Sequence, residues 1–250
     1  MSNLETYRNS AEEKARTADL VRLLPRGRSS ALDIGARDGF FSRLLSEYFE
    51  TVTALDLEMP AFTYPRVVNV AGDATRMPFP DASFDCVFCA EVLEHIPALE
   101  DACREIARVA RHEIVIGVPH KQDTRVGRTT CLQCGNSNPP RGHVNQFDER
   151  RLERLFPGTS IQALSFVGSV VSATNPIFAK LMDLAGNPWG TYDQDEPCIY
   201  CGAELTPPAH RSMFSKVCSA LSVRINRVQE RFTPPHGNWL HVVFSKDLHP

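Results

Sequence analysis

The chain lacks the features that mark several classes of protein. Its 250 residues carry 27 basic and 30 acidic side chains, a formal charge of −3, and so lack the basic excess with which proteins that wrap nucleic acid neutralise phosphates. The longest apolar stretch, near residues 163–173, contains Ser165, Gly168, Ser169 and Ser172, and it is too short and too polar to span a bilayer. The first residues have neither the charged head nor the apolar core of a signal peptide. We therefore expect a cytoplasmic protein whose partners include neither nucleic acid nor a membrane.

Short apolar runs alternate with helical patterns through the first half of the chain. Apolar residues make up 42% of the sequence, enough to bury a full core. The predicted strands are 31–34, 52–55, 67–70, 84–90 and 114–118, with two later ones at 162–167 and 239–244. Strands and helices that alternate at this spacing predict right-handed crossovers and a parallel sheet covered on both faces.

A first helix is expected over residues 4–24. Its predicted apolar face consists of Leu4, Tyr7, Ala11, Ala15, Ala18 and Val21. The regular alternation stops after Pro119, which suggests three parts. Residues 1–118 would form the first helix and the first half of the sheet, and 119–210 two irregular insertions around a short helix and strand. Residues 211–250 would supply a late helix and the last strand.

A glycine turn with acidic neighbours is the most informative local pattern. Asp33 ends the first strand, Gly35 and Gly39 frame the turn that follows, and Asp56 ends the second strand. Dinucleotide-binding proteins share this succession of a strand, a glycine turn, a helix and an acidic residue. The turn here is Gly-x-x-x-Gly rather than Gly-x-Gly-x-x-Gly, so the pyrophosphate cradle is incomplete. Asp33 would repel a pyrophosphate but suits a ligand that carries ammonium and sulfonium groups.

A longer set of motifs extends this pattern over residues 30–118. The set comprises Asp33-Ile34-Gly35-x-x-x-Gly39, Asp56, Gly72-Asp73-Ala74, Pro78-Phe79-Pro80-Asp81-x-Ser83-Phe84-Asp85 and Glu91-Val92-Leu93-Glu94-His95. In this order they resemble the class I S-adenosylmethionine-dependent methyltransferases, in particular the type 11 family. The resemblance implies a Rossmann-like, mostly parallel seven-stranded α/β sheet with an antiparallel last strand, and residues 1–118 as its cofactor-binding half.

The resemblance also implies roles for individual residues toward S-adenosylmethionine. Asp33 and the Gly35–Gly39 loop with Ala36 would hold the methionine end, and Asp56 with Leu57 the ribose. Asp73 and the Ala74 backbone would hold the adenine. Glu91 would line the pocket near methionine and substrate. Arg37-Asp38 departs from the small or polar residues that many relatives have there, but the glycines are kept.

Eight cysteines include two pairs with metal-ligand spacing. Cys131, Cys134, Cys198 and Cys201 lie in two Cys-x-x-Cys-Gly segments, and two such knuckles supply the four thiolates of a tetrahedral structural zinc site. Free thiols, a disulfide within each pair, or an iron–sulfur cluster are the alternatives. Cys86 and Cys89 have the same spacing but fall in a buried strand, where they would point to opposite faces and pack in the core.

Histidines and one basic run are the candidates for acceptor binding. We expect His143, in Gly142-His143-x-x-x-Phe147, to line the substrate pocket and to be the candidate general base. A histidine that only holds the insertion in shape is the alternative. Lys121, Arg125 and Arg128 would either meet an anionic acceptor or form a solvated loop.

The sequence thus predicts a methyltransferase with a zinc-stapled insertion that covers the substrate edge. Its acceptor would be a small molecule or glycan intermediate, methylated on oxygen or nitrogen, with His143 and Glu91 as catalytic candidates. One alternative is an RNA or protein methyltransferase that uses the zinc region for recognition. Another is a protein that binds the cofactor without turnover. The oligomeric state is not predicted.

Overall fold

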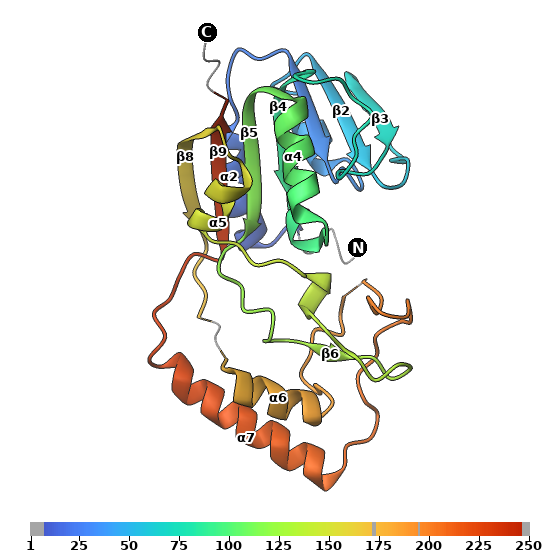
Figure 1. Ribbon diagram of the computed structural model, residues 1–250, viewed down its shortest axis with the longest axis vertical. Helices are drawn as coiled ribbons and strands as arrows, with labels where there is room; N and C mark the ends of the chain where they lie inside the picture. The colour runs from blue at the N-terminus through green and yellow to red at the C-terminus, as the bar shows by residue number, and fades with distance from the viewer. Residues whose placement is uncertain (1–7, 172–173, 195, 247–250) are drawn as a thin grey trace. The chain divides into compact units, whose positions relative to one another are not determined.

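The structure, a computed structural model, describes residues 8–171, 174–194 and 196–246 (Figure 1). The chain forms two compact units. Unit 1 combines the chain up to His120 with residues 147–168 and 237 onward, and unit 2 combines residues 121–146 with 169–236. This division differs from the predicted segments. The short helix and strand of 147–168 belong to unit 1, and the late helix belongs to unit 2.

Unit 1 contains a seven-stranded sheet in the order β3-β2-β1-β4-β5-β9-β8. Its strands are β1 (Ser30–Ile34), β2 (Thr51–Asp56), β3 (Val67–Ala71), β4 (Phe84–Ala90), β5 (Ala110–Pro119), β8 (Ser160–Val167) and β9 (Trp239–Ser245). The pairs among β1 to β5 are parallel, whereas β9 runs antiparallel to both β5 and β8. The predicted mostly parallel sheet and its antiparallel last strand are confirmed.

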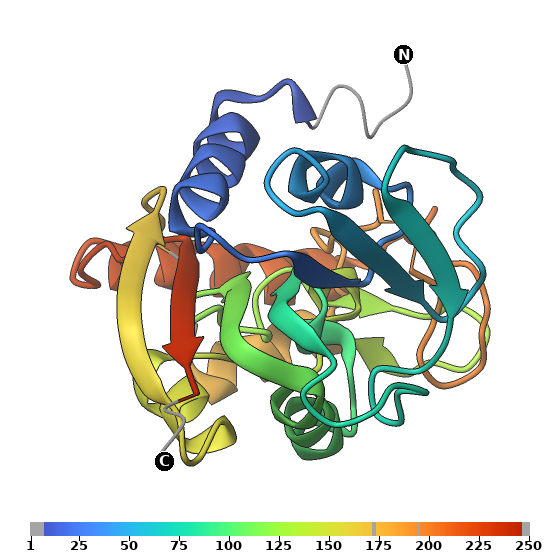
Figure 2. The ribbon, with the colours of Figure 1, turned by 90° about the horizontal axis from the view of Figure 1, so that it is seen from above.

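Helices cover both faces of this sheet (Figure 2). On one face lie α2 (Ala11–Leu23) and α3 (Phe40–Leu45); on the other lie α4 (Leu99–Val109) and α5 (Glu149–Leu155). The short η1 (Leu93–His95) follows β4. Every residue of β4 is buried, and Cys86 and Cys89 pack into the two opposite core layers, as their alternation in the strand predicted.

The buried face of α2 differs from the predicted one. Ala11, Ala15 and Ala18 are exposed, and the helix buries Glu13, Arg16 and Leu20 instead. Alanine offers little apolar surface, so the larger leucine fixes which face turns inward. Arg16 and Glu13 share that face because their charges neutralise each other (Nη2–Oε1 2.6 Å). Leu4 and Tyr7 lie outside the described residues.

Unit 2 has little regular structure besides two helices. It contains β6 (Thr129–Thr130), β7 (Ser137–Asn138), η2 (Pro140–Gly142), α6 (Pro176–Leu184) and α7 (Met213–Glu230), and α6 lies alongside α7 (Figure 1). Its hydrophobic cluster is small, with Cys131, Cys198 and Leu205 at its centre. Among the residues that the structure describes, the helices all fall short of the length and apolarity needed to cross a bilayer.

Candidate functional site

Three acidic residues follow neighbouring strands at one edge of the unit 1 sheet. Asp33 lies in β1, Asp56 ends β2, and Asp73 follows β3. Because β1, β2 and β3 pair in parallel register, their carboxyl ends meet at the same edge. In open α/β sheets this edge is where ligands bind.

The Gly35–Gly39 loop requires glycine at both ends. Gly35 has φ +75°, and a Cβ there would lie 2.2 Å from Cγ2 of Val92. Gly39 has φ +78°, and a Cβ there would lie 2.7 Å from the ring of Phe62. The N–H groups of Gly35 and Ala36 donate to the Leu55 carbonyl at 2.9 and 3.1 Å. The loop is therefore fastened to the end of β2, and its two ends have no room for a side chain.

Asp56 is half-buried beside this loop. Its Oδ2 accepts from the Arg37 backbone N–H and its Oδ1 from the Leu57 N–H, both at 2.7 Å. These bonds fix the plane of the carboxylate. Each oxygen keeps a second lone pair, so the group is oriented to accept from two neighbouring hydroxyls, as a ribose presents them.

Asp33 is the buried member of the three, at 2% exposure. Burial raises the pKa of its carboxyl to about 7; the hydrogen bond from the Ser42 hydroxyl opposes this rise and the charge of Asp56 adds to it. A carboxylate held in so little water gains strongly from a neighbouring cation. Asp33 therefore fits the amino group of a methionine moiety.

Asp73 is exposed, and one of its two carboxylate oxygens is hydrogen-bonded. Its Oδ1 accepts from both the backbone N–H and the hydroxyl of Thr75, each at 2.8 Å. The adjacent Ala74 is buried. Met77, on the same segment, is 5% exposed and belongs to the core. Asp73 thus offers a carboxylate with a fixed direction at the third strand end.

Glu91 follows β4 with a left-handed backbone, φ +58°. The Arg16 guanidinium lies 3.5 Å from its Oε1, and the Trp239 side chain hydrogen-bonds to it. Burial raises the pKa of Glu91; Arg16 opposes this rise and the charge of Glu13 adds to it. Glu13 itself holds Arg16 through two hydrogen bonds, at 2.6 and 2.7 Å. Sequence reasoning missed this support, because a Glu and an Arg three residues apart are ordinary on an exposed helix.

Glu94 is a second buried carboxyl on the same segment. It is fully buried, and both of its oxygens lack a hydrogen-bond partner among the described residues. Burial and the nearby Glu91 charge raise its pKa well above the ordinary value. Burial next to Glu91 therefore favours the protonated form of Glu94 over the charged one.

Two buried histidines, His120 and His143, lie in different units. In unit 1, His120 is buried, and its ring nitrogens face the Gly237 carbonyl at 3.1 Å and Glu149 at 3.4 Å, so it holds loops together. In unit 2, His143 is 6% exposed, and its Nδ1 lies 2.6 Å from Oε1 of Gln122. Since an amide oxygen only accepts, this contact places a proton on Nδ1.

Unit 2 brings the four predicted metal ligands together. The sulfurs of Cys131, Cys134, Cys198 and Cys201 all lie within 4.8 Å of one another, with Sγ–Sγ distances of 3.7 Å (131–201) and 3.6 Å (134–198). All four cysteines are free rather than disulfide-bonded, and the sulfurs of a disulfide would lie about 2.05 Å apart. The two Sγ–Sγ distances match the edge of a tetrahedron with metal–sulfur bonds of about 2.3 Å, which is about 3.8 Å.

The two cysteine turns have the same hydrogen bonds. Cys131 N–H donates to the Asn136 carbonyl, and Cys198 N–H to the Ala203 carbonyl. In each turn a left-handed glycine, Gly135 or Gly202, donates back to the first cysteine. Burial opposes ionisation of Cys198, but the N–H groups of Tyr200 and Cys201 stabilise its thiolate, and its pKa falls to about 6. The donor set and its geometry fit a zinc ion.

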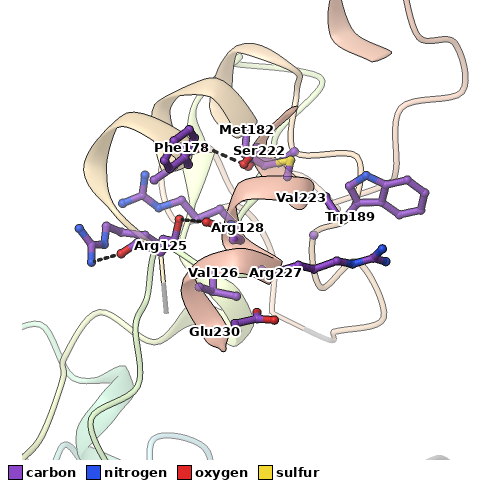
Figure 3. Close-up of a pocket in the computed structure, with 16 residues that line it drawn as sticks. Arg125, Val126, Arg128, Phe178, Met182, Trp189, Ser222, Val223, Arg227 and Glu230 are labelled. Carbon is purple, nitrogen blue, oxygen red and sulfur yellow. Dashed lines mark hydrogen bonds between the residues drawn. The ribbon is translucent and has the colours of Figure 1, made fainter. Parts of the chain in front are cut away.

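A cavity of about 240 Å³ lies within unit 2, between α6, α7 and two loops (Figure 3). Helix side chains that line it are Phe178, Met182, Ser222 and Val223. Two cations of the predicted basic run line it as well, but Arg125 pairs with Asp123 at 2.8 Å and Arg128 with Asp183 at 2.9 Å. Asp123 and Asp183 thus neutralise the charges of these two arginines.

The strand order and the acidic strand ends define a Rossmann-like methyltransferase fold. Comparison with known proteins agrees. Residues 32–115, about a third of the chain, match the model of a family described as a methyltransferase domain. A demethylmenaquinone methyltransferase of Roseiflexus castenholzii is 33% identical over 105 residues, which cover 38% of this chain and 44% of that protein. The chain spans between 35% and 50% of the length of the first curated relatives that it matches.

Solved structures show the same fold at low identity. An S-adenosylmethionine-dependent methyltransferase from Mesorhizobium loti matches with a TM-score of 0.51 at 14% identity, over 95% of this chain and 98% of that one. The [4+2]-cyclase SpnF matches with a TM-score of 0.53 at 18% identity, over 95% and 83%. Because the fold is common to a methyltransferase and a cyclase, the activity has to be argued from the site.

Proposed function

We propose that the protein is an S-adenosylmethionine-dependent methyltransferase that acts on an oxygen or nitrogen of a small-molecule or glycan acceptor. The observation that carries the proposal is the set of carboxylates at the ends of β1, β2 and β3 beside a loop with glycine at both ends. Asp33 is buried, Asp56 is oriented by two backbone N–H groups, and Asp73 is tied by Thr75. This spacing of acids suits an amino group, a ribose and an adenine in one extended ligand.

Each residue has a stated task in holding that ligand. Asp33 accepts from the amino group, and the Gly35–Gly39 loop with Ala36 gives backbone room to the methionine end. Asp56 and the Leu57 segment take the ribose hydroxyls, and Asp73 with the Ala74 backbone takes the adenine. When bound, S-adenosylmethionine supplies an electrophilic methyl group for in-line displacement, and the protein chiefly positions the acceptor.

Glu91 and His143 are the proposed catalytic residues. Glu91 lines the pocket near the methionine end, held by Arg16. With Nδ1 donating to Gln122, His143 would accept a proton at Nε2 from a hydroxyl or amine acceptor. Replacement by glutamine, H143Q, should lower kcat by about a hundredfold or more, in the range expected for a general base. It should leave the affinity for S-adenosylmethionine unchanged.

A structural zinc ion in unit 2 completes the proposal. Four thiolates leave no open position for water or substrate, so the ion would staple the two segments of unit 2 and take no part in the chemistry. The sulfur distances of 3.6 and 3.7 Å support this ligand set.

Calorimetric titration with S-adenosylmethionine and then S-adenosylhomocysteine tests the cofactor. The D56A variant loses charge-assisted hydrogen bonds worth about 1.5–3 kcal/mol, so binding should weaken by about ten- to a hundredfold. The matched control is D101A, which removes an exposed aspartate paired only with Arg104 on α4. Absence of binding by folded wild-type protein, or equal weakening in D101A, would contradict the proposal.

Transfer of a labelled methyl group then tests the acceptor class. Labelled S-adenosylmethionine is supplied with small-molecule, RNA and protein fractions in separate reactions. Label in the small-molecule fraction supports the proposal, whereas label in RNA or protein would reassign the acceptor. Tight cofactor binding without transfer to any fraction would favour a protein that binds the cofactor without turnover.

A further inference from the structure

Helix α7 turns small polar side chains inward and large apolar ones outward. Its buried residues are Ser215, Cys218, Ser219 and Ser222. Hydrogen bonds hold that face to α6 and the segments next to it. The Ser222 hydroxyl donates to the Phe178 carbonyl at 3.0 Å, and the Ser215 hydroxyl donates to the Ala185 carbonyl at 2.7 Å. Asn226 accepts from Thr174 at 2.9 Å. Polar side chains therefore supply the hydrogen bonds that hold α7 in unit 2.

The outward face carries an apolar stripe that Arg224 interrupts. The stripe comprises Met213, Phe214, Val217, Leu221 and Val228, whose exposed fractions lie between 47% and 74%. At about 100° per residue these five positions fall within one narrow arc of the helix. The neighbouring α6 also exposes Ile177 and Leu184, seven residues apart. Surface helices ordinarily bury such a stripe and leave the polar side chains in water.

Basic residues border the stripe. By the same helical arithmetic, Lys216, Arg227 and Arg231 fall along one edge of it, and Arg224 falls within it. Residues 211–231 hold five basic side chains and one acid, whereas the whole chain has a net charge of −3. All four of the residues on or beside the stripe are exposed. Positive charge is thus concentrated where the apolar surface is largest.

We infer that α7 binds an anionic lipid surface. An amphipathic helix with large apolar residues on one face and Lys or Arg at its border lies in the plane of a membrane interface, with the apolar face among the acyl chains and the cations at the headgroups. Such a helix need not span the bilayer. Lipid binding is independent of the proposed methyl transfer, since all of these residues lie in unit 2.

A second copy of this chain fits the same face less well. Pairing of two identical stripes would bring the borders with Lys216, Arg224, Arg227 and Arg231 together, and like charges in contact are repulsive. Anionic headgroups complement these cations instead. The charge pattern therefore favours lipid over a homodimer.

Co-sedimentation of the full chain with vesicles tests the inference. Wild-type protein should sediment with vesicles of phosphatidylcholine that contain phosphatidylglycerol, and only weakly with phosphatidylcholine alone. Each basic residue near an anionic surface contributes about fivefold to partitioning, so the R224Q/R231Q double variant should bind about 25-fold more weakly. V217D should weaken binding by about tenfold or more, because it places a charge in the stripe that would lie among the acyl chains.

A matched control makes the same substitution at an equally exposed valine outside the stripe. Val217 is 61% exposed on α7, and Val68 is 60% exposed on β3 of unit 1. V68D should bind like the wild type, and all variants should keep the wild-type melting temperature because they alter exposed side chains. Failure of folded wild-type protein to bind the anionic vesicles, or equal loss in V68D, would overturn the inference. So would a dimer in sedimentation velocity that V217D dissociates, without lipid binding, since it would assign the stripe to a second copy.

Discussion

Loss of the proposed zinc ion should unfold much of unit 2 and leave the sheet of unit 1 intact. The perturbation is C201S, which removes one of four sulfurs from an exposed position. The matched control is C218S, which removes a thiol of the same unit that lies on α7 and outside the cluster.

The size of the effect follows from a comparison of apolar packing with zinc binding around the two cysteine turns. The hydrophobic cluster of unit 2 centres on Leu205 and two of the ligands themselves, and burial of one leucine side chain contributes about 1.5–3 kcal/mol. Zinc binding by a structural site contributes about 10–16 kcal/mol in small peptides. The metal therefore outweighs the apolar packing several-fold, and no rearrangement of the cluster can replace it.

Metal analysis and hydrogen exchange measure the effect. Wild-type protein and C218S should contain about one zinc ion per chain, and C201S should contain far less. Backbone amides of residues 129–138 and 196–206 should exchange much faster in C201S or after chelation, with β4 and β5 unchanged. Wild-type protein without zinc after growth in zinc-containing medium, or unchanged exchange in C201S, would refute the reasoning.

Three further predictions concern unit 1. G35A should lower the free energy of unfolding by about 2–5 kcal/mol in urea titrations, from its positive φ and a severe overlap. G158A, with a similar φ but open space around it, should cost only about 1–2 kcal/mol. Calorimetric affinity for S-adenosylmethionine should rise with pH around pH 7, because the Asp33 carboxyl ionises there and then attracts the cation; D33N should show no such rise. R16M should cost about 3–5 kcal/mol in denaturant titrations, because it leaves Glu13 buried without its partner, and the E13Q/R16M double variant should recover most of that loss.

Strand periodicity and parallel topology made most of unit 1 predictable. An apolar run such as β4 predicts a buried strand, and parallel strands necessarily bring Asp33, Asp56 and Asp73 to one edge. The spacing of the cysteine pairs likewise predicted that Cys131 and Cys198 would share a cluster, because thiolate turns of that kind are shaped for one ion.

Contacts between distant residues were not predictable from one sequence. The helix α2 was expected to bury alanines, and only the packed structure shows that Arg16 turns inward to Glu13 and Glu91. Helical spacing predicted α7 but did not show whether its apolar side chains face the protein or the solvent. Periodicity reports which residues share a face, and it does not report whether that face meets the protein or something outside it.

The position of β9 between β5 and β8 affects the order of events during synthesis. Strand β8 pairs with β9 in the sheet, and β9 leaves the ribosome only after the whole second segment of unit 2 has been made. Until then β8 has no neighbour in the sheet, while both cysteine turns are already available to bind a metal. Nascent chains acquire structure from the N-terminus onward, so the cysteine cluster would assemble before the sheet does. A ribosome that stalls ahead of Trp239 would leave β8 with an open hydrogen-bonding edge and expose the core beneath it.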